Sequence, residues 1–243
     1  MSVSGRLHSW DLSVGVDGPG TRFVAFTAGC PLRCLYCANP DTWRMRTGTP
    51  TTSGEVLANV ARYRRFIAVA GGGFTVSGGE PLLQPAFTGA LLAGAQDLGL
   101  HTALDTSGFL GARADDDLLA VTDLVLLDIK SWDGALYRRL TGRDLHPTLA
   151  FARRLAARGT PVRVRFVLVP GLTDEPDNVC GVARFAAGLG NVERVDVLPF
   201  HRLGAAKYGE LGMRFPLAHV DPPAEDLVAR VVREFRDAGL TAA

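Results

Sequence analysis

The sequence predicts an α/β fold, specifically a partial (β/α)6 TIM-like barrel of parallel strands. Short, nearly continuous apolar runs alternate about six times with amphipathic stretches, as expected for buried parallel strands joined by helices. Polar residues also gather where these strands are predicted to end, and in a β/α barrel those carboxyl ends form one active-site face. A doubly wound sheet is the alternative, but it binds ligands only at a switch point and would explain fewer of the polar clusters.

The elements follow one another along the whole chain without a linker, a repeat or a low-complexity segment. The predicted strands are Arg22–Thr27, Gly73–Val76, Thr102–Leu104, Leu124–Asp128, Val162–Val169 and Arg194–Leu198. Thr52 and Glu55 form a capping-box pattern that opens a helix extending to about Ala68. Further helices are predicted over Pro85–Leu98, Ala114–Ala120, Thr148–Ala157, Asp177–Ala187 and Ala224–Ala238. Gly99 and Gly159 stand where helix C-terminal caps belong.

Composition and charge limit the classes of protein that fit. The chain has 243 residues, of which 47% are hydrophobic, which suits one domain over residues 1–243 with a full core. The net charge of +1, from 26 basic and 25 acidic residues, gives no electrostatic reason to expect a nucleic-acid or membrane partner. No apolar run approaches the roughly 20 residues that cross a bilayer, and the N-terminus lacks the apolar core of a signal peptide. A cytoplasmic location is therefore expected.

Three cysteines, Cys30, Cys34 and Cys37, offer three thiols on one short segment with the spacing C-x3-C-x2-C. Soft thiolates select zinc, copper(I) or iron–sulfur clusters. A zinc loop normally has a fourth Cys or His at short spacing, whereas here the nearest later His is His101 and the only other Cys is Cys180. A disulfide pair is the other ordinary interpretation. A cluster held by three cysteines would keep one iron open for a ligand, which predicts catalysis and a reducing, anaerobic setting.

The cysteine spacing resembles that of the radical S-adenosylmethionine (SAM) enzymes, and Tyr36 before the last cysteine also matches that family. The resemblance implies that Cys30, Cys34 and Cys37 are the catalytic ligands of one [4Fe-4S] cluster, with SAM on the fourth iron. It also implies a barrel of the radical SAM type. One electron from the reduced cluster would cleave SAM and release a 5′-deoxyadenosyl radical.

A Ser-Gly-Gly-Glu-Pro run follows the second predicted strand. A Gly-Gly turn alone is weak evidence, although glycines allow a backbone to approach a ligand closely. Placed downstream of the cysteines, Gly78, Gly79 and Glu80 resemble the family's Gly-Gly-Glu motif, whose backbone contacts the amino group of SAM.

Carboxylates stand at the ends of the third and fourth predicted strands, in Leu104–Phe109 and Leu127–Lys130. Taken alone, these carboxylates and the nearby Lys130 would be interpreted as an ion pair at a barrel rim. The two stretches closely resemble one subfamily, the activating enzymes of pyruvate formate-lyase. That resemblance implies a monovalent cation, Na+ or K+, beside the SAM carboxylate, and places Lys130 close to SAM. The oxygen ligands of this cation would be Asp105, Thr106 and Asp128.

Three further residues are expected to bind SAM or to meet the protein substrate. Arg165 lies inside an apolar strand, where a charged side chain should face a polar cavity or a partner, and we expect it to contact SAM, with Arg163 in the same strand as the second candidate. His201 follows Leu-Pro-Phe, which resembles the subfamily's Leu-Pro-Tyr-His, and is expected near the nucleoside of SAM. Asp17 lies in an Asp-Gly-Pro-Gly run that locally predicts only a turn, but the N-terminal run also resembles the subfamily, and this resemblance places Asp17 where a protein substrate enters.

The subfamily resemblance runs nearly end to end and implies a function. The substrate would be pyruvate formate-lyase, whose glycyl radical domain loses a glycine Cα hydrogen, with flavodoxin or ferredoxin as electron donor and a monomeric enzyme. No cysteine lies between Cys37 and Cys180, so no second cysteine-bound cluster is expected. Ala38 stands where the subfamily has His. The alternatives are activation of another glycyl radical enzyme, a small-molecule radical SAM reaction, or an electron-carrying iron–sulfur protein that binds no SAM.

Overall fold

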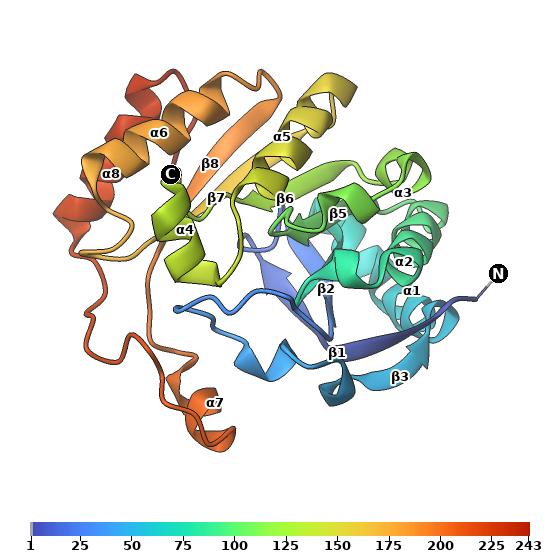
Figure 1. Ribbon diagram of the computed structural model, residues 1–243. Coiled ribbons are helices and arrows are strands. Elements are labelled where there is room, and N and C mark those ends of the chain that lie inside the picture. Colours follow the sequence, from blue (N-terminus) through green and yellow to red (C-terminus); the bar gives the residue numbers. More distant parts are fainter. Residues whose placement is uncertain (1) are drawn as a thin grey trace. The chain divides into compact units, whose positions relative to one another are not determined.

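The computed structural model describes residues 2–243, whose strands form one mostly parallel sheet (Figure 1). Its strand order is β3-β1-β2-β4-β5-β6-β7-β8. The order runs from one edge strand to another, so the sheet is not closed. This confirms the predicted α/β class and its partial barrel.

The chain packs into two compact units, and the single domain over residues 1–243 stays a prediction. The first unit comprises residues up to Pro31, Thr42–Thr106 and Leu110–Leu126, and the second comprises Leu32–Asp41, Ser107–Phe109 and Leu127–Ala243. Across the described residues, no helix is both long and apolar enough to span a membrane.

The first unit contains the first five strands in the sheet order given above. They are β1 (Ser4–Val14), β2 (Thr21–Thr27), β3 (Thr49–Thr52), β4 (Gly73–Gly78) and β5 (His101–Thr106). Strand β1 pairs antiparallel with both β2 and β3, while β2–β4 and β4–β5 are parallel. The parallel strands confirm the first three predicted strands. The antiparallel strands β1 and β3 were not predicted.

Three helices of the first unit lie side by side, and short 3-10 turns link the elements (Figure 1). The helices are α1 (Ser53–Val69), α2 (Pro85–Asp97) and α3 (Asp116–Ala120), and the 3-10 turns are η2 (Met45–Thr47), η3 (Pro81–Leu83) and η4 (Gly111–Arg113). A further 3-10 turn, η1 (Pro40–Thr42), has its first two residues in the second unit. The predicted capping box opens α1, because the Thr52 hydroxyl accepts from the Glu55 amide and the Glu55 carboxylate accepts from the Thr52 amide. Phe23 and Phe74 are fully buried and their rings pack together in this unit's core.

The second unit holds the remaining strands and helices. They are the end of β6 (Leu124–Asp128), α4 (Gly134–Thr141), α5 (His146–Arg158), β7 (Val162–Leu168), α6 (Pro176–Ala187), β8 (Val192–Pro199), α7 (Ala205–Glu210) and α8 (Glu225–Asp237). Strands β7 and β8 are parallel. The structure thus confirms the other three predicted strands, whereas helices α4 and α7 were not predicted.

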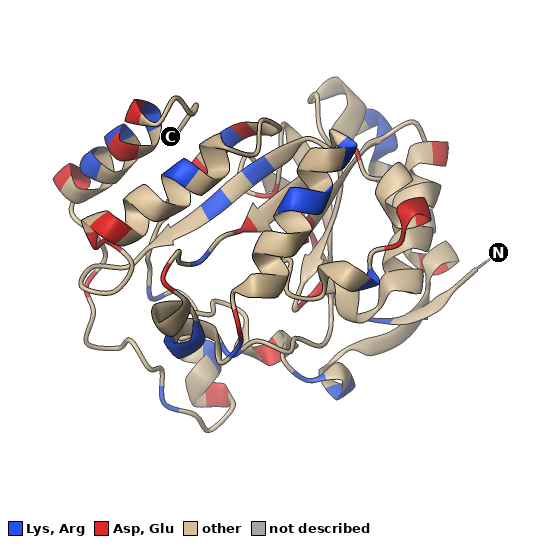
Figure 2. Cartoon of the chain, turned by 45° about the horizontal axis from the view of Figure 1, so that its top comes forward, with Lys and Arg blue, Asp and Glu red and all other residues tan. Residues whose placement is uncertain are grey.

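Alternation along β7 places Phe166 in the core and turns Arg163 and Arg165 to the opposite face. Phe166 packs edge to face against Phe235 of α8. Helix α8 carries both signs of charge along its exposed side (Figure 2) and buries Val231 and Phe235 on the other. This is the amphipathic pattern of a helix that covers a sheet.

Candidate active site

The three cysteines lie on an irregular segment, residues 28–39, that leaves the carboxyl end of β2. All three cysteines are partly buried, and none of them forms a disulfide with another described residue. In the second unit, the amides of Arg33 and Leu35 donate to the carbonyls of Thr141 and Leu140, at 2.8 and 2.9 Å. These carbonyls belong to the last turn of α4, whose carbonyl groups have no partner within the helix itself. Helix α4 therefore holds the cysteine loop in place.

In the first unit, the start of the same segment packs directly on the Gly-Gly-Glu motif. The Gly79 amide donates to Thr27 O at 2.9 Å, and the Glu80 amide donates to Gly29 O at 2.8 Å. A Cβ at Gly79 would lie 2.3 Å from Gly29 O, and Gly78 has a φ of +119°. The two glycines are thus required for contact between two backbones, which brings the motif against the residue before Cys30.

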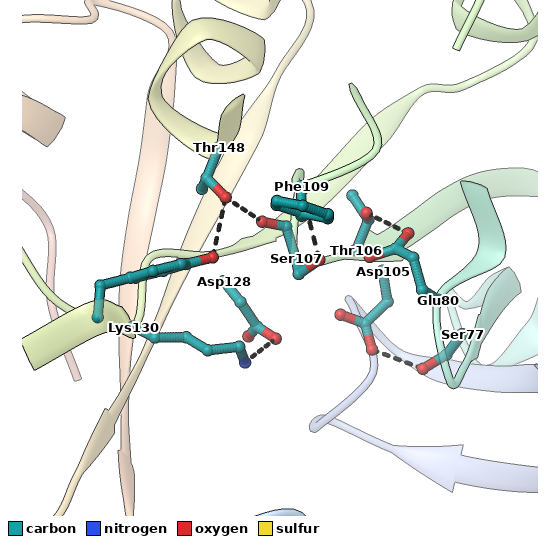
Figure 3. Close-up of polar contacts among 10 residues, drawn as sticks. Ser77, Glu80, Asp105, Thr106, Ser107, Phe109, Asp128, Lys130 and Thr148 are labelled. Carbon is teal, nitrogen blue, oxygen red and sulfur yellow. Dashed lines mark hydrogen bonds and ion pairs between the residues drawn. The ribbon is translucent and has the colours of Figure 1, made fainter. Parts of the chain in front are cut away.

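Two carboxylates of the first unit accept hydrogen bonds from hydroxyl groups (Figure 3). Ser77 Oγ donates to Asp105 Oδ2 at 2.6 Å, and Thr106 Oγ1 donates to Glu80 Oε1 at 2.6 Å. Glu80 is fully buried and also accepts from the Leu82 amide, so its carboxylate is the N-cap of η3. Ser77, Asp105 and Thr106 stand at the carboxyl ends of β4 and β5, where the sequence predicted a polar cluster.

A buried ion pair marks the carboxyl end of β6 in the second unit (Figure 3). Lys130 Nζ lies 2.8 Å from Asp128 Oδ2 and 5.6 Å from the centre of the Tyr36 ring. Burial disfavours the charge on Lys130, but the Asp128 carboxylate, which also accepts its hydrogen bond, outweighs this effect with smaller contributions from Tyr36 and Cys34, and the Lys130 pKa is raised well above its usual range. A positive charge is therefore held permanently beside the cysteine loop.

The cysteine segment fits an iron–sulfur cluster. Burial raises the pKa of the Cys34 thiol to about 11, with Lys130 opposing this shift and Cys37 and Asp128 adding to it. A buried thiol of this kind becomes a thiolate when it binds a metal. No three His, Cys, Asp or Glu side chains among residues 2–243 are grouped so as to hold one metal ion. This does not argue against a cubane cluster, because each cysteine of a cubane binds a different iron atom.

The arginines and the histidine that were predicted near SAM lie on or just after strands β7 and β8. The Arg165 carbonyl on β7 accepts from the Ile129 amide at 3.1 Å, which sets Arg165 beside the end of β6, whereas Arg163 pairs with Glu193 at 3.7 Å. His201 is exposed just after β8.

Asp17 lies in the turn between β1 and β2. The Asp17 carbonyl accepts a hydrogen bond from Thr75 Oγ1 at 2.7 Å. Thr75 Oγ1 in turn accepts a hydrogen bond from Nε of the buried Arg22 at 2.9 Å. Thr75 and Ser77 are two residues apart on β4 and share one face. The Asp17 turn is therefore tied to the β4 face that carries Ser77.

Several residues that support the site were not singled out from the sequence. Asn178 of α6 accepts from Ser131 Oγ at 2.7 Å and from the Trp132 amide at 2.8 Å, and donates to Thr173 O at 2.8 Å. It thereby fixes the turn that follows Lys130. Lys207 of α7 contacts Asn39 and Asp41, just beyond the last cysteine. The sequence carries no local signal for either contact.

Fold and site together define the class of protein. The chain belongs to the radical SAM superfamily, whose sequence profile matches residues 24–180. It is 42% identical over 234 residues to the pyruvate formate-lyase 1-activating enzyme of Escherichia coli K12, covering 95% of each chain. The pyruvate formate-lyase-activating enzyme of Listeria monocytogenes is 41% identical over 233 residues, which span 93% of this chain and 94% of the relative. These findings confirm the predicted family.

Solved structures agree with this assignment. A domain of a pyruvate-formate lyase-activating enzyme from Bacteroides vulgatus superposes with a TM-score of 0.60 at 27% identity, covering 71% of this chain and 98% of that one. A radical SAM methyltransferase from Sphaerobacter thermophilus gives a TM-score of 0.67 at 20% identity, over 100% of this chain and 72% of that one, and shares the fold.

Proposed function

We propose that this chain is the activating enzyme of pyruvate formate-lyase. The observation that carries the proposal is similarity to such enzymes along 95% of both chains, together with three partly buried cysteines on the loop after β2. Pyruvate formate-lyase is then the protein substrate, and one glycine of its glycyl radical domain is the reacting residue.

Cys30, Cys34 and Cys37 would ligate one [4Fe-4S] cluster. When bound, the cluster would pass one electron from an external reductant to SAM, and this chemistry would supply the radical that takes a hydrogen atom from glycine Cα. The contribution of this chain is to hold three thiolates at fixed positions. The Glu80 amide binds Gly29 O just before Cys30, and the carbonyls of α4 bind the amides on either side of Cys34.

Lys130 would orient the carboxylate of SAM. Its ammonium group is buried, remains charged, and is aimed by Asp128 toward the Tyr36 ring. Asp105, Thr106 and Asp128 remain the proposed oxygen ligands of a monovalent cation, supported by their residue types and their places at strand ends. The backbone of Gly78, Gly79 and Glu80 would receive the amino group of SAM.

The other assignments follow the same proposal. Arg165 would contact SAM, His201 would lie near its nucleoside, and Asp17 would meet the entering protein. Flavodoxin or ferredoxin as the electron donor, a monomeric enzyme and a cytoplasmic location likewise remain predictions.

The test is anaerobic activation of purified pyruvate formate-lyase by the reduced, cluster-loaded chain with SAM. We expect an electron paramagnetic resonance (EPR) doublet from a glycyl radical, formed with an equal amount of 5′-deoxyadenosine. A partner whose reacting glycine is replaced by Ala is the matched control and should give no doublet. Cleavage of SAM without a radical on pyruvate formate-lyase would instead support activation of a different protein or a small-molecule substrate.

A further inference from the structure

Helix α7 follows β8 and is too short to be stable alone. It spans six residues, Ala205–Glu210, whereas isolated helices below about 12 residues are marginal in water. The residues that lead into it, His201, Arg202 and Leu203, are exposed. Contacts with other parts of the second unit must therefore hold α7 in place.

The first such contact is between two backbones. Gly204 is the N-cap of α7, and a Cβ there would lie 2.8 Å from Ala38 Cα and 3.0 Å from Cys37 O. The entry to α7 consequently rests on the chain at and just after the third cysteine.

The second contact is made by a charge. Lys207 Nζ donates to Asn39 Oδ1 at 2.7 Å and lies 3.0 Å from Asp41 Oδ2. One ammonium group thus joins two acceptors on the segment that follows Cys37. Tyr208, the next residue, is buried and packs on Phe215, and burial, together with its nearness to Cys37 and Cys34, raises its pKa. It is therefore a further contact that fixes α7 beside the cysteine segment.

These contacts connect two segments with different assigned tasks. The segment ending at Asp41 carries the last cluster ligand, and the segment from His201 to Lys207 carries the residue assigned to the nucleoside of SAM. We propose that Lys207 is a positioning residue that fixes these two segments to each other, so that SAM is bound at both its methionine and its nucleoside ends. The expected effect on SAM binding rests on the proposed function. The contacts of Lys207 with Asn39 and Asp41 are present in the chain without cluster or SAM.

The ion pair is partly exposed, with side-chain accessibilities of 36% for Lys207 and 26% for Asp41. Such pairs contribute little to global stability, so removing one should leave folding intact. The effect should instead appear locally, in the order of residues 37–41 and in the affinity for SAM. This distinguishes positioning from a general structural role.

The test compares Lys207→Met with Arg202→Met. Arg202 lies on the same segment and forms an ion pair with Asp221 at 2.7 Å, but this pair does not touch the cysteine loop. Hydrogen exchange of the cluster-free chain should be faster at residues 37–41 in Lys207→Met and unchanged in Arg202→Met. With the cluster loaded, Lys207→Met should weaken SAM binding about three- to tenfold at unchanged iron content.

Two more variants sharpen the result. Lys207→Arg should recover most of the SAM affinity, and Asp41→Asn should reproduce part of the loss without adding fully to Lys207→Met. Equal exchange and equal SAM affinity in wild type and Lys207→Met would overturn the proposal. A wild-type chain that binds no SAM would contradict the proposed function. Hydrogen exchange at residues 37–41 would still show whether Lys207 holds this segment in place.

Discussion

The two units of the chain hold their site carboxylates in different ways. In the first unit, Asp105 and Glu80 accept hydrogen bonds from the hydroxyls of Ser77 and Thr106. In the second unit, Asp128 binds the ammonium group of Lys130. A hydroxyl donor orients a carboxylate and leaves its negative charge, whereas an ion pair neutralises it. The first arrangement suits an incoming cationic group, and the second presents a cation to an incoming anion.

Under the proposed function, these two arrangements would serve different ligand groups. The hydroxyl-bonded Asp105 would be a ligand of the monovalent cation, and the backbone of Gly78, Gly79 and Glu80 would receive the amino group of SAM. A carboxylate suits Lys130.

Replacing any one cysteine of the loop should remove the site altogether. Cys30→Ala, Cys34→Ala and Cys37→Ala should each lose iron–sulfur loading and SAM cleavage, because a cubane with three protein ligands has none to spare. Iron content and 5′-deoxyadenosine formation are the measurements. Cys180→Ala is the control, because Cys180 is exposed and outside the loop; a loss of cluster in this variant would contradict the assignment of a single cluster.

Gly79→Ala should disturb both the fold and the cysteine loop. A Cβ there would lie 2.3 Å from Gly29 O, and relieving such an overlap should cost about 2 kcal/mol or more in unfolding free energy. Chemical unfolding and iron loading would both report it. The matched control is Gly134→Ala, where a Cβ meets nothing within 4 Å. Equal stability of the two variants would mean that the Gly29–Gly79 backbone contact is not required.

Asp128→Asn should leave the buried charge of Lys130 without its compensating partner. Breaking such a pair on one side costs about 2 to 4 kcal/mol in unfolding free energy, since the Lys130 side chain is only 8% exposed. SAM binding should weaken as well. Asp144→Asn removes the partner of Arg138 in an exposed pair and should change stability by less than about 1 kcal/mol. A similar, small change in both variants would refute the electrostatic contrast between the two units.

Ser77→Ala should have a smaller effect because it removes one neutral donor. The loss of its hydrogen bond to Asp105 should cost about 1 kcal/mol in unfolding free energy and lower SAM affinity by a few fold. Isothermal titration with SAM under anaerobic conditions is the measurement. Ser77→Thr keeps the hydroxyl and serves as the matched variant. SAM affinity that does not change in Ser77→Ala would remove Asp105 from the binding site.

The Cys34 thiol of the cluster-free chain should lose its proton at a higher pH than an ordinary cysteine. Because burial raises its folded pKa from 9.0 to about 11, the stabilising effect of the neutral thiol is present below about pH 9 and is lost as the pH rises through about 11. At pH 8 the folded chain should therefore hold about a hundredfold less Cys34 thiolate than an ordinary cysteine. Alkylation followed by peptide mapping should find Cys34 labelled much more slowly than exposed Cys180. Equal labelling rates would contradict the burial of Cys34.

Much of this arrangement could be predicted from the sequence. The residues at strand ends, such as Asp105 and Asp128, follow short apolar runs, and a run of that kind predicts both the strand and the place where it ends. The capping box at Thr52 is likewise a local pattern. Each of these signals lies within a few residues of the feature that it predicts.

The missed elements had weaker or non-local signals. Helix α4 has only eight residues, although Asp133 before it and Gly142 after it are an N-cap and a left-handed C-cap that could have indicated it. Strand β1 is half exposed, and the alternation of Trp10, Leu12 and Val14 was its only sign. That α4 carbonyls bind the cysteine loop, or that Lys207 binds Asp41, depends on tertiary packing and could not be predicted from local sequence.

The central claim is that Cys30, Cys34 and Cys37 hold one cluster to which SAM binds. Anaerobic reconstitution and reduction, followed by EPR with and without SAM, tests it most directly. The account predicts a signal from one reduced [4Fe-4S] cluster per chain that changes when SAM is added, with 5′-deoxyadenosine as a product. A chain that binds zinc or no metal, or a cluster signal indifferent to SAM, would contradict it.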